Sequence, residues 1–223
     1  MPTSDAILAA ATTIANEWRT VAIAWHGIVA VLLTAFFRGW RPSTRVAAYV
    51  LSAPFLSVSV AAWVWGNPFN GTVFATLFLF LIALASRLSE EPVHFGTPVL
   101  VTLGAVFVAF GWGYPHFLET DRWMTYGYAA PLGVLPCPTL SAVIGATLIF
   151  GLLGSPVWAI TLATAGLVYG AMGVFVLGVQ FDYVLLAATL LLVGALGTFT
   201  SPLRSAHTTS ALNRHRASSG CRE

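Results

Sequence analysis

The 223-residue chain contains no lysine, and all ten of its basic residues are arginines. The missing lysine excludes Schiff-base chemistry, including the attachment of retinal. Charged residues are also scarce, at 8% of the chain against 57% hydrophobic residues, and the mean hydropathy is +0.83. A water-soluble domain of this size cannot cover its surface with so few charges, so we expect lipid to be the solvent for most of the surface. The net charge of +2 gives no indication of a nucleic-acid partner.

Cysteine is nearly absent too, since only Cys137 and Cys221 occur. Cys137 lies in a proline-rich stretch and Cys221 in a polar tail, so the sequence indicates no disulfide framework. Motifs of nucleotide-binding loops, zinc peptidases and acyl transfer are missing. An enzyme is therefore the least favoured class, and the sequence points to no particular cofactor.

Apolar residues occur in long runs that turn-forming or charged residues separate. We expect an all-α, polytopic bundle of seven transmembrane helices in one domain over residues 21–199, because a ~30 Å hydrocarbon layer needs roughly 20 apolar residues per crossing. We expect residues 1–20 to form a helical lead-in at the interface and residues 200–223 to form a disordered basic tail. The expected spans are residues 21–37, 46–65, 72–85, 97–112, 139–153, 156–176 and 183–199.

The arginines predict the orientation, because cytoplasmic loops carry an excess of basic residues. With the N-terminus outside and the C-terminus in the cytoplasm, only Arg19 and Arg122 face outside. The stretch 113–138 is then extracytoplasmic and is expected to fold back over the bundle as a cap, and Asp182 is expected on the same side. Eight arginines face the cytoplasm: Arg38, Arg41, Arg45, Arg87, Arg204, Arg214, Arg216 and Arg222.

The segment from Leu135 to Thr139, LPCPT, is the most specific local feature. Its two prolines, Pro136 and Pro138, favour an extended, stiff backbone at Cys137, and Thr139 is expected to be the N-cap of the fifth span. A thiol just outside a helix N-terminus is favoured as thiolate and suits soft-metal binding or redox chemistry. Alternatively, the cysteine is merely a small buried residue in a rigid connection to the helix.

Further candidates lie upstream of this segment. His116, Glu119 and Asp121 would form a metal or acid–base cluster if their segment were helical, because the i, i+3 spacing places the first two on one face. The alternative is a hydrated rim in which Arg122 neutralises one carboxylate. Aromatic side chains are expected to line the mouth of a solute site: Trp112, Tyr114, Tyr126 and Tyr128.

Inside the expected spans, only His26 is an ionisable candidate. It is either a ligand or proton carrier, or a neutral imidazole bonded to a backbone carbonyl of a neighbouring helix. Gly166, Gly170 and Gly173 form a flat strip on the sixth span, which favours close helix packing or docking of a partner helix.

Several runs resemble a family of small bacterial polytopic membrane proteins that is known as a domain of unknown function. The runs are AAPLGVLPCPT (residues 129–139), the Tyr114–Pro115 pair, LGVQFD (177–182) and GNPFNGTVFATLF (66–78). The resemblance covers residues 24–195 and implies a bacterial inner-membrane location and seven helices, but no activity. Its matching positions are Pro131, Gly133, Val134, Pro136, Cys137, Pro138 and Thr139.

Three functions stay open at this point. The first is a permease-like or solute-binding protein for a small neutral or weakly polar molecule. The second is a membrane thiol or metal-handling protein centred on Cys137 with His116. The third is a structural subunit of a larger membrane assembly, a homo- or hetero-oligomer docked through the glycine faces. Membrane lipids are the expected partners in every case.

Overall fold

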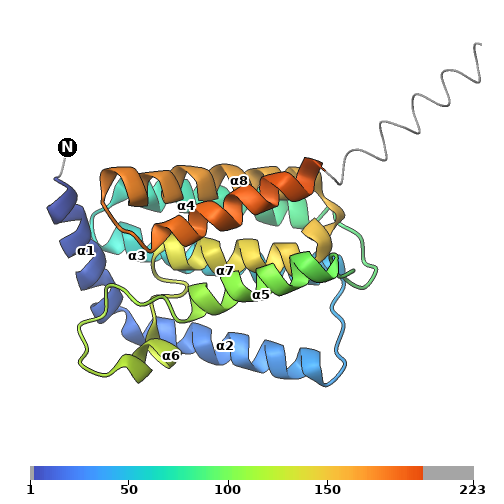
Figure 1. Cartoon of the computed structure of the whole chain (residues 1–223), viewed down its shortest axis with the longest axis horizontal. Coiled ribbons are helices and arrows are strands. Elements are labelled where there is room, and N and C mark those ends of the chain that lie inside the picture. The colour runs from blue at the N-terminus through green and yellow to red at the C-terminus, as the bar shows by residue number, and fades with distance from the viewer. Residues whose placement is uncertain (1–2, 198–223) are drawn as a thin grey trace, which may run out of the picture.

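The computed structural model describes residues 3–197, and every regular element within them is helical (Figure 1). The all-α class predicted from the sequence is therefore confirmed. The expected tail, residues 200–223, lies outside the described residues. The helices are α1 (Ser4–Glu17), α2 (Arg19–Phe37), α3 (Thr44–Val64), α4 (Pro68–Ala85), α5 (Pro98–Trp112), η1 (Trp123–Thr125), α6 (Tyr126–Ala129), α7 (Pro136–Ile149), η2 (Gly151–Gly154), α8 (Pro156–Ala171), the π-helical turn η3 (Met172–Val176) and a last helix, Asp182–Gly197.

Four helical segments are long and apolar enough to cross a membrane: α2, α3, α4 and the continuous stretch Pro156–Val176, which joins α8 to η3. The helices α5, α7 and Asp182–Gly197 are apolar but shorter. The expectation of a membrane protein is supported at this level. The number of crossings and their orientation stay predictions.

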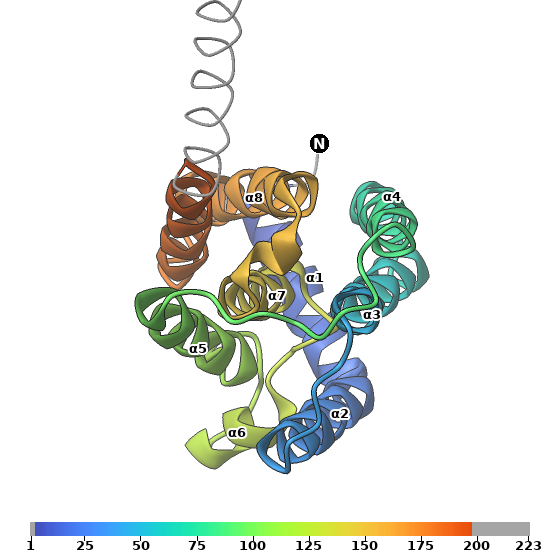
Figure 2. The ribbon, with the colours of Figure 1, turned by 90° about the vertical axis from the view of Figure 1, so that its right-hand side faces the viewer.

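Helix α7 lies in the middle of the bundle, with α3, α5 and α8 around it (Figure 2). Its residues Leu140, Ile144 and Leu148 are fully buried. Helix α5 packs closely on α7 because Gly104 and Gly145 have no side chains to separate the two backbones. A methyl group on either glycine would lie 2.5 Å from the carbonyl oxygen of the other.

The glycine strip of α8 and η3 is covered by the chain itself. A methyl group on Gly166 would lie 2.3 Å from the Thr189 Oγ1 atom, and one on Gly170 would lie 2.9 Å from the Leu186 side chain. Both partners belong to the last helix. The strip therefore seats Asp182–Gly197 against α8, and these glycines offer no free face to a partner helix.

Helix α7 starts earlier than predicted. Its first residue is Pro136 and its N-cap is Leu135, so Cys137 lies in the first helical turn and not on extended backbone before the helix. The prolines fit because N–H groups of the first turn have no acceptor within the helix, so that their loss removes no hydrogen bond. Thr139 lies inside the helix, and its predicted role as N-cap is wrong.

The Thr139 hydroxyl instead stabilises the turn before α7. It donates to the Leu135 carbonyl at 2.7 Å and accepts from the Gly133 N–H at 2.9 Å. Gly133 has a φ of +72°, which favours glycine, and the Trp25 ring would lie 2.2 Å from a Cβ placed there. The Ser57 hydroxyl donates to the Gly133 carbonyl and accepts from the Trp25 indole. This network joins α2, α3 and α7.

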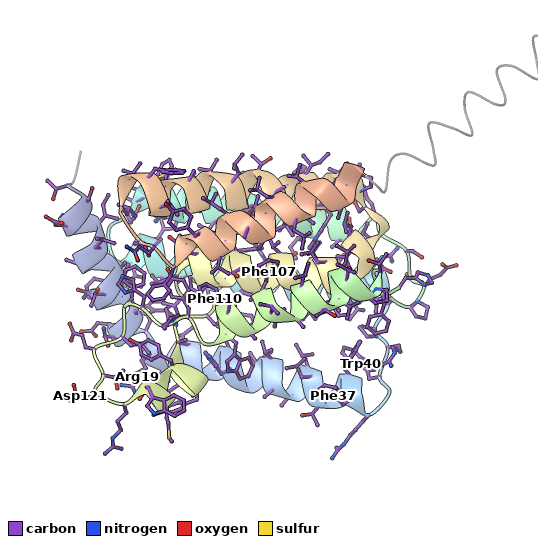
Figure 3. All side chains as sticks on the ribbon, in the orientation of Figure 1. Arg19, Phe37, Trp40, Phe107, Phe110 and Asp121 are labelled. Carbon is purple, nitrogen blue, oxygen red and sulfur yellow. The ribbon has the colours of Figure 1, made fainter. Side chains whose placement is uncertain are left out.

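The stretch 113–138 lies at one end of the bundle. Figure 3 shows Arg19 and Asp121 at that end, with Phe37 and Trp40 at the opposite end. The stretch contains η1 and α6, but its first part is not helical. Phe117 has a φ of +73°, which breaks any helix there. The helical spacing assumed for His116 and Glu119 therefore does not exist.

Candidate functional site

A carboxylate that the sequence analysis did not single out lies buried at the cap end of the bundle. Asp182, the first residue of the last helix, is only 2% exposed. Its Oδ1 atom accepts a hydrogen bond from the Tyr114 hydroxyl at 2.7 Å, and its Oδ2 atom accepts one from the Cys137 thiol at 3.1 Å. Three segments that are far apart in sequence thus meet at one carboxylate. We call Tyr114, Cys137 and Asp182 the Asp182 cluster.

Tyr114 reaches the carboxylate through a layer of aromatic rings. It is 1% exposed, stacks on Phe117 at 6.2 Å, and meets Phe110 and Phe181 edge-on at 5.5 Å and 6.3 Å between ring centroids. Burial above all, and then the neighbouring Asp182 carboxylate, raise the pKa of Tyr114 far above its ordinary value. The phenol therefore stays protonated and acts as a donor. The position of Tyr114 is inside the protein, and not at an open mouth as expected.

The backbone of η3 makes room for the carboxylate. A methyl group on Gly173 would lie 1.8 Å from the Asp182 Oδ2 atom. The Gly173 carbonyl accepts from the Val179 N–H at 2.8 Å, which ties the π-turn to the loop before Asp182. π-Helical turns are rare in proteins, and those that occur are often found at functional sites. The buried carboxylate beside this π-turn is therefore a candidate functional site.

His116 lies at the edge of the cluster. Its ring packs on Phe117 at 4.1 Å and on Phe181 at 6.0 Å between centroids. Burial lowers the pKa of His116, and the Asp182 carboxylate opposes this effect in part. At neutral pH the imidazole is therefore uncharged and does not form an ion pair with Asp182.

The predicted metal or acid–base cluster is not assembled. Glu119 and Asp121 are exposed, and the Glu119 N–H bonds to the Asn16 side chain at 3.1 Å. Among residues 3–197, no three His, Cys, Asp or Glu side chains gather as metal ligands would. Cys137 and Asp182 alone supply two protein ligands, whereas a tetrahedral soft-metal site takes three or four.

The other aromatic candidates hold the cap stretch in place. The Tyr126 hydroxyl donates to the Leu118 carbonyl at 3.2 Å, and the Trp112 indole donates to the Gly127 carbonyl at 2.7 Å. Tyr128 is half-exposed. These contacts stabilise the fold of the stretch 113–138, which contributes Tyr114 and Cys137 to the Asp182 cluster.

His26 has the environment expected of a structural histidine. It is buried in α2, with its Nε2 atom 2.8 Å from the Trp112 carbonyl oxygen of α5 and its Nδ1 atom 2.8 Å from the Ala22 carbonyl oxygen. The contact with Trp112 joins α2 to α5 at the cap end. The His26 ring also meets the Trp112 ring edge-on, with 4.7 Å between ring centroids. A backbone carbonyl of a neighbouring helix is thus within hydrogen-bond distance of His26, and its role as a ligand or proton carrier stays a prediction.

Sequence reasoning found Tyr114 and Cys137 but missed Asp182 and the seat that Gly173 provides. A signal existed, since Asp182 directly precedes the apolar run of the last helix. Carboxylates that adjoin a span are costly in a membrane and are functional candidates for that reason.

No family model, curated protein or solved structure matches the chain. The resemblance to a domain of unknown function therefore stays a prediction.

Proposed function

We propose that the chain is a seven-helix protein of the bacterial inner membrane, with its N-terminus outside and its C-terminus in the cytoplasm. Four long and three shorter apolar helices run side by side between the two ends of the bundle (Figure 1). The 15 residues of α5 span about 22 Å at 1.5 Å per residue, a length that local thinning of the bilayer accommodates. The eight-to-two distribution of the arginines favours this orientation.

Reporter fusions test the topology. Fusions after Arg87 and Arg204 should be cytoplasmic, and a fusion after Met124 should be periplasmic. A periplasmic signal from the fusion after Arg204 would show that the number of crossings is not seven.

The function that the geometry supports best is permease-like or solute-binding, for a small neutral or weakly polar molecule. The observation that carries this proposal is the buried Asp182 carboxylate, held by two donors beside a π-helical turn. A hydroxyl or amide N–H of a solute replaces the Tyr114 or Cys137 donor without adding a charge to the interior. Such an exchange keeps the carboxylate hydrogen-bonded in both states, which a buried charged group requires.

Swelling of proteoliposomes tests this function. Purified protein in vesicles should accelerate the osmotic swelling caused by at least one of glycerol, urea or a small sugar, relative to empty vesicles. Asp182→Asn and Tyr114→Phe should reduce the rate. Tyr126→Phe removes the same hydroxyl group outside the Asp182 cluster and should leave the rate unchanged. The proposal fails if no solute crosses faster than in empty vesicles, or if both tyrosine variants behave alike.

The contact between the Cys137 thiol and the Asp182 carboxylate favours a second candidate, a membrane protein that handles thiols or a soft metal. In that case a Cys221→Ser variant, which removes the other thiol, should bind one equivalent of Ag⁺, and adding Cys137→Ser to it should abolish this binding. A role as a structural subunit has less support, because the glycines Gly166, Gly170 and Gly173 pack within the chain. Subunits that co-purify with the protein would favour that role.

A further inference from the structure

Helix α2 is fastened to the bundle at its two ends but not between them. Near its start, the Trp25 indole bonds to Ser57 and His26 contacts the Trp112 carbonyl. At its end, the Phe36 ring packs on Phe95 at 5.6 Å between centroids. No residue of α2 after His26 is buried.

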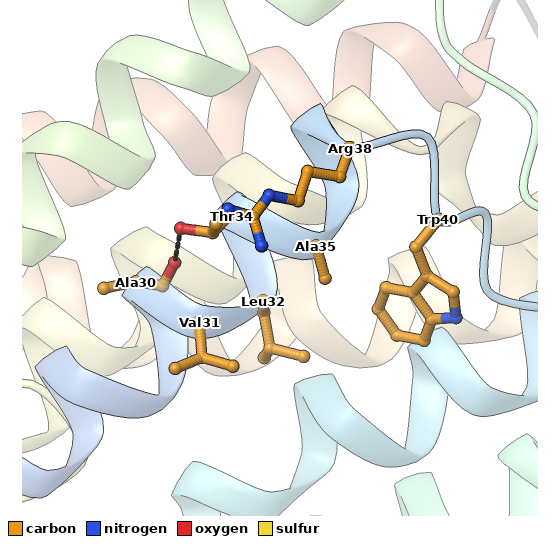
Figure 4. A pocket seen from close by; sticks show the side chains of 7 residues that line it. All are labelled: Ala30, Val31, Leu32, Thr34, Ala35, Arg38 and Trp40. Carbon is orange, nitrogen blue, oxygen red and sulfur yellow. Dashed lines mark hydrogen bonds between the residues drawn. The ribbon is translucent and has the colours of Figure 1, made fainter.

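A hollow of about 840 Å³ lies along this unfastened part of α2. Its volume is within the range of roughly 300–1,000 Å³ that is typical of sites for organic ligands. Figure 4 shows Val31, Leu32 and Ala35 on the side where the Trp40 indole lies. The one hydroxyl in the wall, that of Thr34, already donates to the Ala30 carbonyl at 2.8 Å. The wall is therefore apolar along its length and suits a hydrocarbon chain.

One side chain that lines the hollow is an arginine with no partner among the described residues, and in Figure 4 its guanidinium lies back along α2 near Thr34. The Arg38 guanidinium makes no hydrogen bond or ion pair with any residue from 3 to 197, although it lines the hollow. Its two neighbours are engaged: Arg41 donates to the Phe36 and Trp40 carbonyls, and Arg45 pairs with Glu90. Arg38 is thus the group in this loop that is left to bind an anion.

We propose that this hollow binds one anionic phospholipid, with an acyl chain along Val31, Leu32 and Ala35 and the phosphate at Arg38. The proposal rests on the membrane location proposed above, where hydrocarbon and not water fills an apolar hollow. Trp40 lies where the headgroup would be, and tryptophan prefers that depth. A basic side chain at the membrane surface attracts anionic headgroups, and Arg38 is placed to do so.

Native mass spectrometry of protein released from nanodiscs tests the site. The nanodiscs contain phosphatidylcholine mixed with phosphatidylglycerol, and the lipids retained on each variant are counted. Wild type should retain phosphatidylglycerol with a preference of about fivefold over phosphatidylcholine, which corresponds to one basic side chain at the surface. Arg38→Gln should lose this preference. Arg87→Gln makes the same change outside the hollow and should keep it.

Filling the hollow provides a second, independent test. Ala35→Trp should lower the retention of both lipids while Arg38 stays in place, and Leu32→Trp replaces it if the first variant does not fold. Equal retention of the two lipids by wild type, a preference that survives in Arg38→Gln, or retention unaffected by the tryptophan would each overturn the proposal. A dimer that Ala35→Trp dissociates would also overturn it, because a second copy would then fill the hollow.

A failure of the lipid site is distinguishable from a failure of the membrane topology. Nanodiscs present the same lipids to both ends of the protein, so the retention assay does not depend on orientation. Reporter fusions test the orientation without reference to lipid retention.

Discussion

Replacing Gly173 by alanine tests whether the π-turn seats the Asp182 carboxylate. The added methyl group would lie 1.8 Å from the Asp182 Oδ2 atom, and ordinary contact begins at 3.4 Å. The oxygen must therefore retreat by roughly 1.6 Å, which exceeds the tolerance of a hydrogen bond. The contact with the Cys137 thiol, now 3.1 Å, is the first to be lost.

The magnitude follows from opposing effects. A hydrogen bond to a charged group contributes about 1.5–3 kcal/mol, and alanine is favoured over glycine in a helix by up to about 1 kcal/mol. We therefore expect Gly173→Ala to lower the free energy of unfolding by about 1–2 kcal/mol. For a chain of this length that corresponds to a decrease in Tm of about 2–8 °C.

Thermal unfolding in detergent, followed by tryptophan fluorescence, measures this effect. Gly194→Ala is the matched control, because a methyl group there would contact nothing within 4 Å. The control should be neutral or slightly stabilising. If Gly173→Ala unfolds at the same temperature as Gly194→Ala, the carboxylate is free to move and the proposed seat does not exist.

Three further predictions concern other parts of the cap end. Cys137 is partly buried and hydrogen-bonded to a carboxylate, so a membrane-impermeant maleimide should not label it in intact cells until the fold is denatured. Cys221, in the predicted cytoplasmic tail, should react once the membrane is opened. Fast labelling of Cys137 in intact cells would contradict the structure. Thr139→Val should lower the free energy of unfolding by about 1–3 kcal/mol, because the buried Gly133 N–H loses its acceptor. The control Thr161→Val removes an exposed hydroxyl and should have little effect on the thermal unfolding curve. Burial lowers the pKa of His116, so the unfolded chain takes up a proton more readily than the folded one. The contribution of the uncharged His116 to the free energy of unfolding is fully present above the unfolded pKa of about 6.5 and declines as the pH falls below it. The Tm of His116→Gln should therefore depend less on pH in this range than the Tm of wild type.

The helices themselves were predictable because each apolar run ends at residues that break helices. Ser155 and Pro156 begin α8, as the local rules for helix starts predict. Helix α4, in contrast, begins at Pro68 with Asn67 as its N-cap, four residues before the expected span 72–85, so the expected turn before that span is partly helical. The start of α7 was placed too late because two rules competed there. A threonine before an apolar run resembles an N-cap, but a proline three residues earlier fits the first turn just as well.

The Asp182 cluster was not predictable from local rules. Tyr114 and Asp182 are 68 residues apart, and they meet because α5, α7 and the last helix pack together at one end. Helical spacing predicted Glu119 as the neighbour of His116. This was wrong because the positive φ of Phe117 breaks the helix that would have placed the two side chains on one face. Side chains that cooperate across helices depend on packing, and a single sequence does not encode that contact in any short motif.

The Asp182 cluster is not what stability alone favours. Taking a carboxylate out of water costs several kcal/mol, and replacing such groups with well-packed apolar residues is often neutral or stabilising. No arginine among residues 3–197 forms an ion pair with Asp182. The ion pair within these residues joins Arg45 to Glu90. Two hydrogen bonds and a glycine without a side chain are what the fold provides to hold the carboxylate in place. A buried carboxylate held by two hydrogen-bond donors therefore fits the proposed solute site better than a purely structural role.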